Sequence, residues 1–256
     1  MTERTRRIGL IVPSSNTTME TEIPELLRRH GERYGTSVTF HSSRARLHTV
    51  DAESLARMVA DSDRCAEELG DADVDVVAYA CLVAVMAQGP GAHAEVEDRL
   101  RAVLAGTRSS TAPMTSSAGA LVRTLTDLGL RRVAVVAPYM PALTELVVGY
   151  LEDSGIGVAD SVSLSVADNC AVGRLDPADL PDHVARLDTT GVDGIVLSAC
   201  VQMPSRPAVQ AVEDALGLPV VTAATATTRE ILLALGLEPH VTGAGAALAT
   251  TSPVGT

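Results

Sequence analysis

The chain has 256 residues, of which 46% are hydrophobic, so it is long enough to form one large domain or two small ones around a substantial core. The hydrophobic content excludes a disordered chain, and a charged fraction of 20% excludes a long solvated helix or coiled coil. Aromatic residues make up only 2% and the formal net charge is −12, which disfavours nucleic acids and anionic membrane surfaces as partners.

Short apolar runs, rich in β-branched residues, alternate along the chain with segments of helical periodicity. The runs, in chain order, are 8–13, 74–80, 133–138, 194–199 and 219–222. Apolar residues at helical spacing predict helices around 55–69 and 143–150. Continuous apolar runs are typical of strands that are buried on both faces of a parallel sheet. The alternation therefore predicts an α/β fold with parallel sheets.

The second half of the chain repeats the first, and this repeat is more informative than any single motif. RRIGLIVP at 6–13 corresponds to RRVAVVAP at 131–138, and MTSSAGALVRTLTDLGL at 114–130 corresponds to VTAATATTREILLALGL at 221–237. Between these segments, each copy has an apolar run that ends in Ala-Cys. Each copy is expected to have the order strand, helix, strand ending in Ala-Cys, helix, strand, helix.

We expect two pseudo-symmetric halves, each a parallel β-sheet flanked by helices. Residues 1–130 would form the N-terminal half with Cys81, and residues 131–256 the C-terminal half with Cys200. No Gly/Ser-rich linker separates them, so the halves should pack tightly. Ligands bind beyond the carboxyl ends of parallel strands, so a pseudo-twofold axis would make the two thiols face each other across one cleft.

Each of these two cysteines precedes a turn into a helix, where backbone amides favour anions and would favour the thiolate. Packing alone does not easily explain cysteines at matched positions of a repeat, so a functional role is preferred for Cys81 and Cys200. Cys65 shares the apolar face of its predicted helix, and Cys170, expected in a loop, is also interpreted as a small buried residue. Free thiols in the cytosol are expected, because the N-terminal apolar run is too short for a signal peptide.

The sequence contains no metal-ligand spacing, no C-x-x-C and no nucleotide-binding or nucleophile motif. We therefore expect no metal and no cofactor, with the chemistry carried by side chains alone. No apolar run approaches the roughly 20 residues that a membrane-spanning helix needs.

The sequence resembles the aspartate/glutamate racemase superfamily, and within it the maleate cis–trans isomerase family most closely. The similar stretches are RIGLIVPSSNTTMETEIP near the N-terminus, AYACLVAVMAQGPGAH around Cys81, VVAPYMP around Tyr139, ADNCAVGRL around Asn169 and SACVQMPS around Cys200. The resemblance covers essentially the whole chain. Racemases of this group tend to carry Asn-Thr after the first cysteine and Thr-His after the second, whereas this chain has Leu-Val and Val-Gln. The similar arylmalonate decarboxylase keeps only one catalytic cysteine, so the presence of both in this chain argues against that activity.

This resemblance implies cofactor-free interconversion of maleate and fumarate by a homodimer that binds a small dicarboxylate. It implies that Cys81 is the nucleophile and that Cys200 donates and accepts a proton. The substrate-binding residues it implies are Asn16, Leu82, Val83, Tyr139, Asn169, Val201 and Gln202. The backbone of the pairs that follow the cysteines would hold the carboxylates.

The residues themselves leave alternatives open. Asn16 lies in a Ser/Thr-rich cluster typical of a helix N-cap, Tyr139 could simply pack, and Asn169 could be a turn residue. Arg174 and Arg206 lie near the motifs, but the resemblance does not mark them. Two other functions remain possible: a two-cysteine amino-acid or hydantoin racemase, and a non-catalytic dicarboxylate-binding protein.

Overall fold

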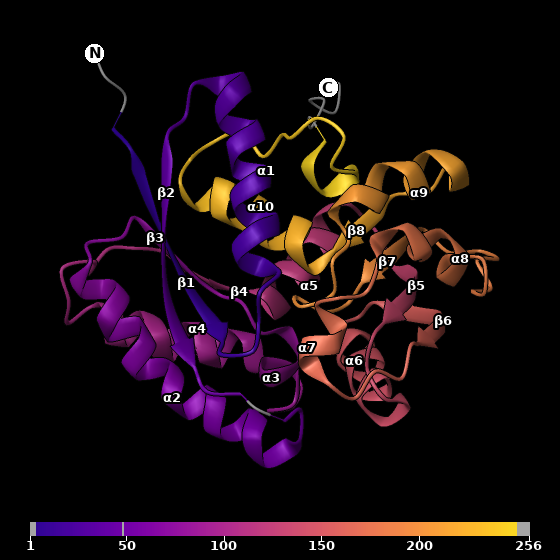
Figure 1. Ribbon diagram of the computed structural model, residues 1–256, viewed down its shortest axis with the longest axis horizontal. Helices are drawn as coiled ribbons and strands as arrows, with labels where there is room; N and C mark the ends of the chain where they lie inside the picture. Colours follow the sequence, from indigo (N-terminus) through magenta and orange to yellow (C-terminus); the bar gives the residue numbers. More distant parts are fainter. Residues whose placement is uncertain (1–3, 48, 250–256) are drawn as a thin grey trace.

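The described residues form two four-stranded parallel β-sheets, one in each half of the chain (Figure 1). The structure is a computed structural model, and it describes residues 4–47 and 49–249. The strand order is β2-β1-β3-β4 in the first sheet and β6-β5-β7-β8 in the second, so the two halves have the same topology. Every recorded strand pairing is parallel. The expected α/β class with two similar parallel sheets is confirmed.

The elements of the first half follow one another without long gaps. Its strands are β1 (Arg6–Pro13), β2 (Val38–Ala45), β3 (Val76–Tyr79) and β4 (Met114–Ser116). Its helices are α1 (Met19–Tyr34), α2 (Ala52–Asp71), α3 (Leu82–Met86), α4 (Ala92–Leu104) and α5 (Ser117–Asp127).

The second half has the same strand order with shorter helices. Its strands are β5 (Arg132–Ala137), β6 (Gly157–Ser163), β7 (Gly194–Ser198) and β8 (Val220–Thr222). Its α-helices are α6 (Pro141–Asp153), α7 (Asn169–Val172), α8 (Leu180–Val184), α9 (Val209–Leu216) and α10 (Ala223–Ala234). Its 3₁₀ helices are η1 (Pro177–Asp179), η2 (Arg206–Ala208) and η3 (Ala246–Leu248).

Two of the four edge strands, β2 and β6, are absent from the sequence-based expectation, which was incomplete here. Both strands are paired on one side only, β2 with β1 and β6 with β5. Most of their residues are polar or partly exposed, as in VTFHSSRA and GVADSVS. Because one edge of each strand is solvated, neither segment needs the continuous apolar run that marks the central strands.

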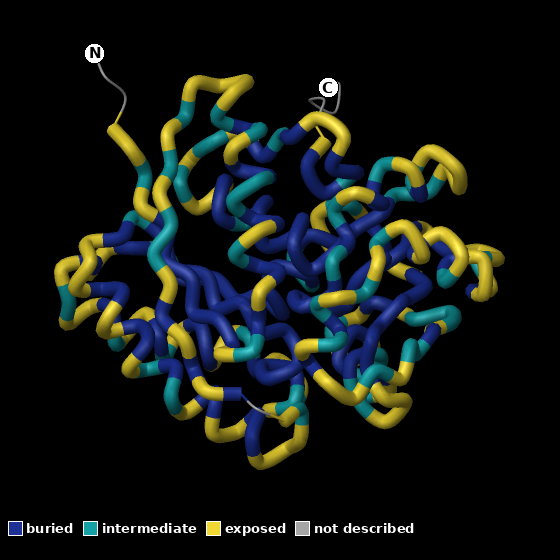
Figure 2. The backbone as a smooth tube through the Cα atoms, viewed as in Figure 1, coloured by how far each residue is buried: buried dark blue, intermediate teal, exposed yellow. Residues whose placement is uncertain are grey.

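The last helix of the chain ties the two halves together. Helix α10 packs against α1 and α5 of the first half as well as against β8 of its own (Figure 1). The hydroxyl of Thr227 on α10 lies 3.0 Å from that of Ser117 on α5 and donates to it. The buried residues form one hydrophobic core within the described chain, and the strands that cross the interior are its most buried part (Figure 2).

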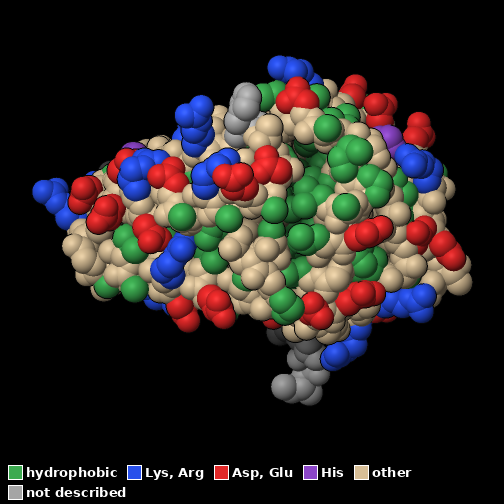
Figure 3. Space-filling model, turned by 90° about the horizontal axis from the view of Figure 1, so that it is seen from below, with side chains coloured by type: hydrophobic (Ala, Val, Ile, Leu, Met, Phe, Trp, Pro, Cys, Tyr) green, Lys and Arg blue, Asp and Glu red, His purple; other side chains and the backbone are tan. Residues whose placement is uncertain are grey.

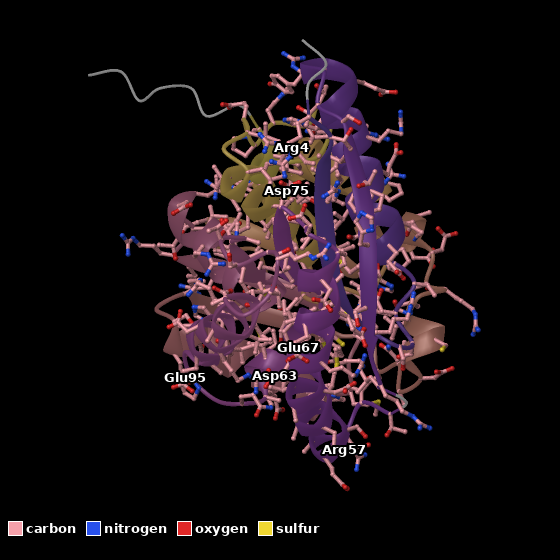
Figure 4. All side chains as sticks on the ribbon, turned by 90° about the vertical axis from the view of Figure 1, so that its left-hand side faces the viewer. Arg4, Arg57, Asp63, Glu67, Asp75 and Glu95 are labelled. Carbon is pink, nitrogen blue, oxygen red and sulfur yellow. The ribbon has the colours of Figure 1, made fainter. Side chains whose placement is uncertain are left out.

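Charged side chains of both signs cover the outer flank beside β1 and α2 (Figure 4). Arg4 and Asp75, both labelled in Figure 4, form an ion pair of 2.7 Å. None of the helices in the described part of the chain is both long and apolar enough to cross a bilayer.

Candidate active site

Cys81 and Cys200 line one common cavity at the carboxyl ends of β3 and β7. Each cysteine comes two residues after the end of its strand, and β3 and β7 are both interior strands of their sheets. Both thiols are nearly buried, with exposed fractions of 3% and 4%. The cavity is lined by Pro13, Asn16, Leu47, Val50, Cys81, Leu82, Val83, Tyr139, Asn169, Cys200, Val201 and Gln202. Every residue that the sequence singled out for the site therefore lines this cavity.

The cavity lining also includes residues that the sequence analysis missed. Leu47 and Val50 belong to the segment between β2 and α2. Their placement depends on β2, which gives no apolar run, so the sequence offered no signal for them. Together they supply apolar side chains on the wall nearest α2.

The cavity is small as the structure stands. Its volume is about 20 Å³, which is close to the smallest space that holds one water molecule and too little for a four-carbon diacid. A larger pocket of about 320 Å³ shares Val50, Tyr139 and Asn169 with it and is otherwise lined mainly by apolar residues. Figure 3 looks onto this side of the molecule and shows hydrophobic side chains gathered around a hollow. A substrate must therefore widen the inner cavity on entry from the outer pocket.

Burial holds the Cys81 thiol in its protonated form at neutral pH. Cys81 is the N-cap residue of α3, and the nearby Ala84 backbone amide lowers its pKa, as the sequence-based expectation has it for helix turns. Burial acts in the opposite direction and is larger, so it raises the pKa of Cys81 to about 12. In the net effect on this pKa, burial therefore outweighs the turn.

Cys200 has a more polar environment than Cys81. The backbone N–H of Gln202 donates to its sulfur at 3.4 Å, and the Tyr139 hydroxyl also hydrogen-bonds to that sulfur. Burial raises the pKa of the Cys200 thiol, while these donors lower it. Burial also raises the pKa of Tyr139 well above its ordinary value, so the phenol keeps its proton and can donate.

Asn16 both begins a helix and joins the two halves. Its Oδ1 accepts from the backbone N–H groups of Thr18 and Met19, at 3.0 and 3.1 Å, where α1 begins. Its Nδ2 donates to the Val201 carbonyl at 3.2 Å, beside Cys200. The expected capping role and a place in the cavity wall are therefore combined in one side chain.

The Gln202 side chain is fully engaged by protein groups. Its Nε2 donates to the carbonyls of Ser15 and Asn169, at 3.1 and 3.0 Å, and its Oε1 accepts from the Thr17 N–H at 2.9 Å. This amide links the loop after β1, helix α7 and the loop after β7. A ligand at this position would therefore contact the backbone of Gln202. The side chain of Gln202 instead holds the surrounding loops together.

Asn169 and Cys170 differ in part from the sequence-based expectation. Asn169 is the first residue of α7, which Asp168 caps, and its Nδ2 donates to Ser15 Oγ at 2.8 Å. Cys170 lies in α7 and is exposed, so the expectation of a buried loop residue was wrong. Its backbone N–H is bonded to the capping Asp168, and this places its side chain on the outer side of a short helix. Cys65 is fully buried, as expected.

The cavity wall carries no charged side chain among the described residues. Arg174 and Arg206 are not part of this lining. Within the described ranges, no three His, Cys, Asp or Glu side chains are grouped closely enough to hold a metal ion. The wall offers two thiols, a phenol, three carboxamides and backbone amides. This set is suited to nucleophilic and acid–base chemistry on an anion held by neutral donors.

Similar proteins are found over nearly the whole length of the chain. The family model for arylmalonate decarboxylase matches residues 8–248. Maleate isomerase from Pseudomonas putida KT2440 is 57% identical over 94% of this chain and 96% of its own length. Maleate isomerase from Geobacillus stearothermophilus is 54% identical over 94% of this chain and 96% of its own.

Solved structures of maleate isomerases are also similar to this chain over nearly its whole length. The maleate isomerase Iso from Pseudomonas putida S16 has a TM-score of 0.94 and 51% identity, covering 96% of this chain and 99% of that one. The Nocardia farcinica maleate cis–trans isomerase, as a cysteine-to-serine variant with a covalently bound succinylcysteine intermediate, has a TM-score of 0.93 and 48% identity, covering 97% of this chain and 100% of that one. The near-complete coverage, the high identity and the shared fold show that this chain is an enzyme of the maleate isomerase family.

Proposed function

We propose that this enzyme converts maleate to fumarate without a cofactor, through a transient covalent bond to Cys81. The observation that carries the proposal is the small cavity whose wall combines two nearly buried thiols, one from each half, with neutral hydrogen-bond donors and no charged side chain among the described residues. The succinylcysteine intermediate of the Nocardia farcinica relative supports the same chemistry here.

The chemistry follows from the properties of sulfur. Cys81 first gives up its proton to solvent as the substrate binds, and the resulting thiolate adds to one alkene carbon and forms a C–S bond. The π electrons move to the other carbon and into its carboxylate, where N–H and O–H donors stabilise the developing enediolate charge. The former double bond is now single and rotates, and elimination of the thiolate then re-forms it in the trans geometry. A thiolate serves both as nucleophile and as leaving group, which the two steps require.

Cys200 is proposed to donate a proton to the carbanionic carbon and to remove it again before elimination. Its hydrogen bonds with Tyr139 and the Gln202 amide stabilise the thiolate left after donation. Asn16, Tyr139 and Asn169, with the backbone around Leu82-Val83 and Val201-Gln202, are proposed to hold the carboxylates.

Proton NMR of a maleate solution tests this function directly. Wild-type enzyme is expected to deplete maleate and form fumarate, and Cys81→Ser is expected to lose the conversion. Cys170→Ser removes an exposed thiol outside the cavity and should keep it. A Cys81→Ser protein that retained most of the wild-type rate would show that Cys81 is not the nucleophile.

Two further measurements separate this function from its alternatives. A Cys200→Ala protein mixed with maleate should carry a succinyl-sized mass addition on the Cys81 peptide. Exchange of the α-proton of amino acids or hydantoins in heavy water, without maleate turnover, would instead favour a racemase. Fumarate binding without any turnover, unchanged in Cys81→Ser, would favour a binding protein.

The homodimer implied by the family resemblance belongs to the same proposal. Analytical ultracentrifugation of the purified chain should give twice the mass of one chain, 26.5 kDa. The four cysteines are all free, which suits the cytosol that the sequence favours.

A further inference from the structure

Glu22 is a buried carboxylate that reaches from one half of the molecule to the other. It lies in the first turn of α1 and is only 5% exposed. Its Oε1 accepts from the backbone N–H groups of Ser205 and Arg206, at 2.7 and 2.6 Å, and its Oε2 accepts from Ser205 Oγ at 3.2 Å. The donors belong to the loop that follows Cys200, 183 residues further along the chain.

Burying a carboxylate at this position opposes folding unless its donors compensate. Burial raises the pKa of Glu22, and the hydrogen bonds from Ser205 and Arg206 counter that effect. No ion pair to Glu22 is recorded among the described residues, so hydrogen-bond donors hold this carboxylate. Two of these donors are the backbone amides where η2 begins, which would otherwise lack partners.

The donors lie at the far end of the loop that shapes the surroundings of the Cys200 sulfur. At the near end, Ser198 Oγ donates to the Cys200 carbonyl at 2.9 Å. In the middle, the Gln202 side chain is bonded to the loop after β1 and to α7. Only four residues separate Cys200 from Ser205, and one of them is Pro204. A displacement at Ser205 must therefore be absorbed close to the Gln202 amide that donates to the sulfur.

We propose that Glu22 is a positioning residue for the reaction, because its carboxylate fixes the 201–206 loop and thereby aims the Cys200 thiol at the substrate carbon. It touches neither the cavity nor Cys200, and it acts only through the loop. The inference rests on the proposed role of Cys200 in proton transfer. It also accounts for a buried carboxylate that has no part in the cavity wall.

Glu22→Gln tests the proposal, with Glu25→Gln as the matched control. The substituted amide keeps the size of the side chain but turns an NH₂ group toward one of the donors. Glu25 lies one turn further along the same helix, where it pairs with Arg28 and Arg29 at the surface. In Glu22→Gln, hydrogen–deuterium exchange of the 201–206 amides should be at least about tenfold faster than in wild type, and in Glu25→Gln it should be unchanged.

Kinetics then separate positioning from simple structural support. A displaced Cys200 thiol should lower kcat by roughly 10- to 100-fold, since misplacement by about 1 Å costs rates of this order. KM should rise by a smaller factor, because the Val201-Gln202 backbone of the same loop is proposed to hold a carboxylate. The succinyl adduct on Cys81 should accumulate in Glu22→Gln during turnover, because the displaced Cys200 thiol is the group that must remove the proton before elimination. Alkylation of Cys200 should also shift to higher pH, because its sulfur loses the Gln202 donor.

Each contrary result has one meaning. Unchanged exchange of the 201–206 amides in Glu22→Gln overturns the proposal that Glu22 holds the loop. Faster exchange with wild-type kcat and no adduct overturns the positioning role. If Glu22→Gln does not fold, Glu22→Asp replaces it, because aspartate keeps the charge with one methylene fewer. This variant should give intermediate effects on amide exchange, on kcat and adduct formation, and on Cys200 alkylation. Wild-type values in all of these measurements would overturn the proposal. If wild-type enzyme fails to convert maleate, the proposed function fails, whereas amide exchange and Cys200 alkylation still decide the role of Glu22.

Discussion

The two cavity thiols are chemically the same side chain in different surroundings. Near Cys81 only the Ala84 backbone amide lowers the thiol pKa, whereas at Cys200 the Tyr139 hydroxyl and two backbone amides lower it. Burial raises the pKa of both, but the extra donors favour the anion at Cys200 more than at Cys81. This asymmetry suits the proposed roles, since Cys200 must hold a negative charge after it gives up its proton.

The pH dependence of Cys81 alkylation follows from its buried position. With a pKa of about 12, the thiol should react slowly with iodoacetamide at pH 7 to 9 in the substrate-free enzyme, and the rate should still be rising above pH 10.

The raised pKa of Cys81 also affects the stability of the fold. The contribution of this thiol is fully present below pH 9.0, its ordinary pKa, and is lost as the pH rises through 12. Urea midpoints of wild type and Cys81→Ser, measured at pH 7 and pH 10, report this difference. An alkylation profile with a midpoint below pH 8 would contradict the burial argument.

Tyr139→Phe removes one hydroxyl from the Cys200 sulfur and leaves the ring in place. The pKa of Cys200 should rise, because its hydrogen bond with Tyr139 is one of the effects that lower it. We expect kcat to fall about tenfold, the cost of one hydrogen bond to an anion at roughly 1.5 kcal/mol. Tyr34→Phe is the control, since Tyr34 is exposed and its hydroxyl lies 3.0 Å from His240 Nδ1, away from the cavity lining. Equal rates for the two variants would argue against a role for the Tyr139 hydroxyl.

At the scale of elements, the site is built by loops that cross between the halves. The loop after β1 bonds to Val201 and Gln202, and the N-terminus of α7 bonds to Ser15. These contacts make the position of each loop depend on the others. A substitution that moves one of them should therefore affect the cavity without touching it.

Gly173→Ala is such a substitution. An added Cβ would lie 2.6 Å from Gln202 Nε2 and 3.3 Å from Thr17 Oγ1. The Gln202 side chain cannot swing away without losing its bonds to Ser15 and Asn169, so we expect a loss of about 1–2 kcal/mol of stability and a lower kcat.

Gly149→Ala is the matched control for Gly173→Ala. Gly149 is in the interior of α6 with nothing within 4 Å of the added atom. It should be neutral or stabilising by about 0.5–1 kcal/mol. Urea unfolding and the fumarate assay measure both variants, and a Gly173→Ala protein as active and stable as Gly149→Ala would contradict the crowding argument.

The sequence predicted those parts of the site that the repeat marks. The central strands, both cavity cysteines and the residues next to them follow from continuous apolar runs that end in Ala-Cys and from the family motifs. The edge strands β2 and β6 were missed because half-solvated strands need no such run, and Leu47 and Val50 were missed with them.

Glu22 gave no signal in the sequence at all. In the segment METEIPELL it looks like any acidic residue in the first turn of a helix. Its partners are backbone amides in the other half of the chain, and tertiary packing alone brings them together. Contacts of this kind depend on the complete fold, and no local pattern predicts them.

At the scale of the whole molecule, the two halves are joined at the helices as well as at the site. Arg123 on α5 pairs with Glu97 on α4 and with Glu230 on α10, at 3.1 and 2.7 Å. Glu97 is 6% exposed and also accepts from the backbone and hydroxyl of Ser116. Arg123 therefore pairs with two carboxylates at the junction of the halves, and Arg229 also pairs with Glu230, at 3.5 Å.

Arg123→Ala should destabilise the protein by about 2 kcal/mol, because it leaves the buried Glu97 without its cation. The value is below that for a fully buried pair since Arg123 is partly exposed. Arg28→Ala, which breaks surface pairs with Glu25 and Glu32, should leave the urea midpoint nearly unchanged. Urea unfolding followed by circular dichroism gives both numbers, and equal midpoints for the two variants would show that the junction does not depend on this cation.

The buried, protonated state of the cavity thiols also determines which cysteine is oxidised first when the substrate-free enzyme is stored. Peroxide attacks thiolates, so Cys81 and Cys200 are protected from oxidation as long as they keep their protons and stay out of solvent. Cys170 is not protected by burial, since it is exposed on α7. Oxidants in air-exposed enzyme therefore meet Cys170 before the reactive pair, and sulfenic acid or intermolecular disulfide formed there is an early mark of storage that precedes any loss of turnover.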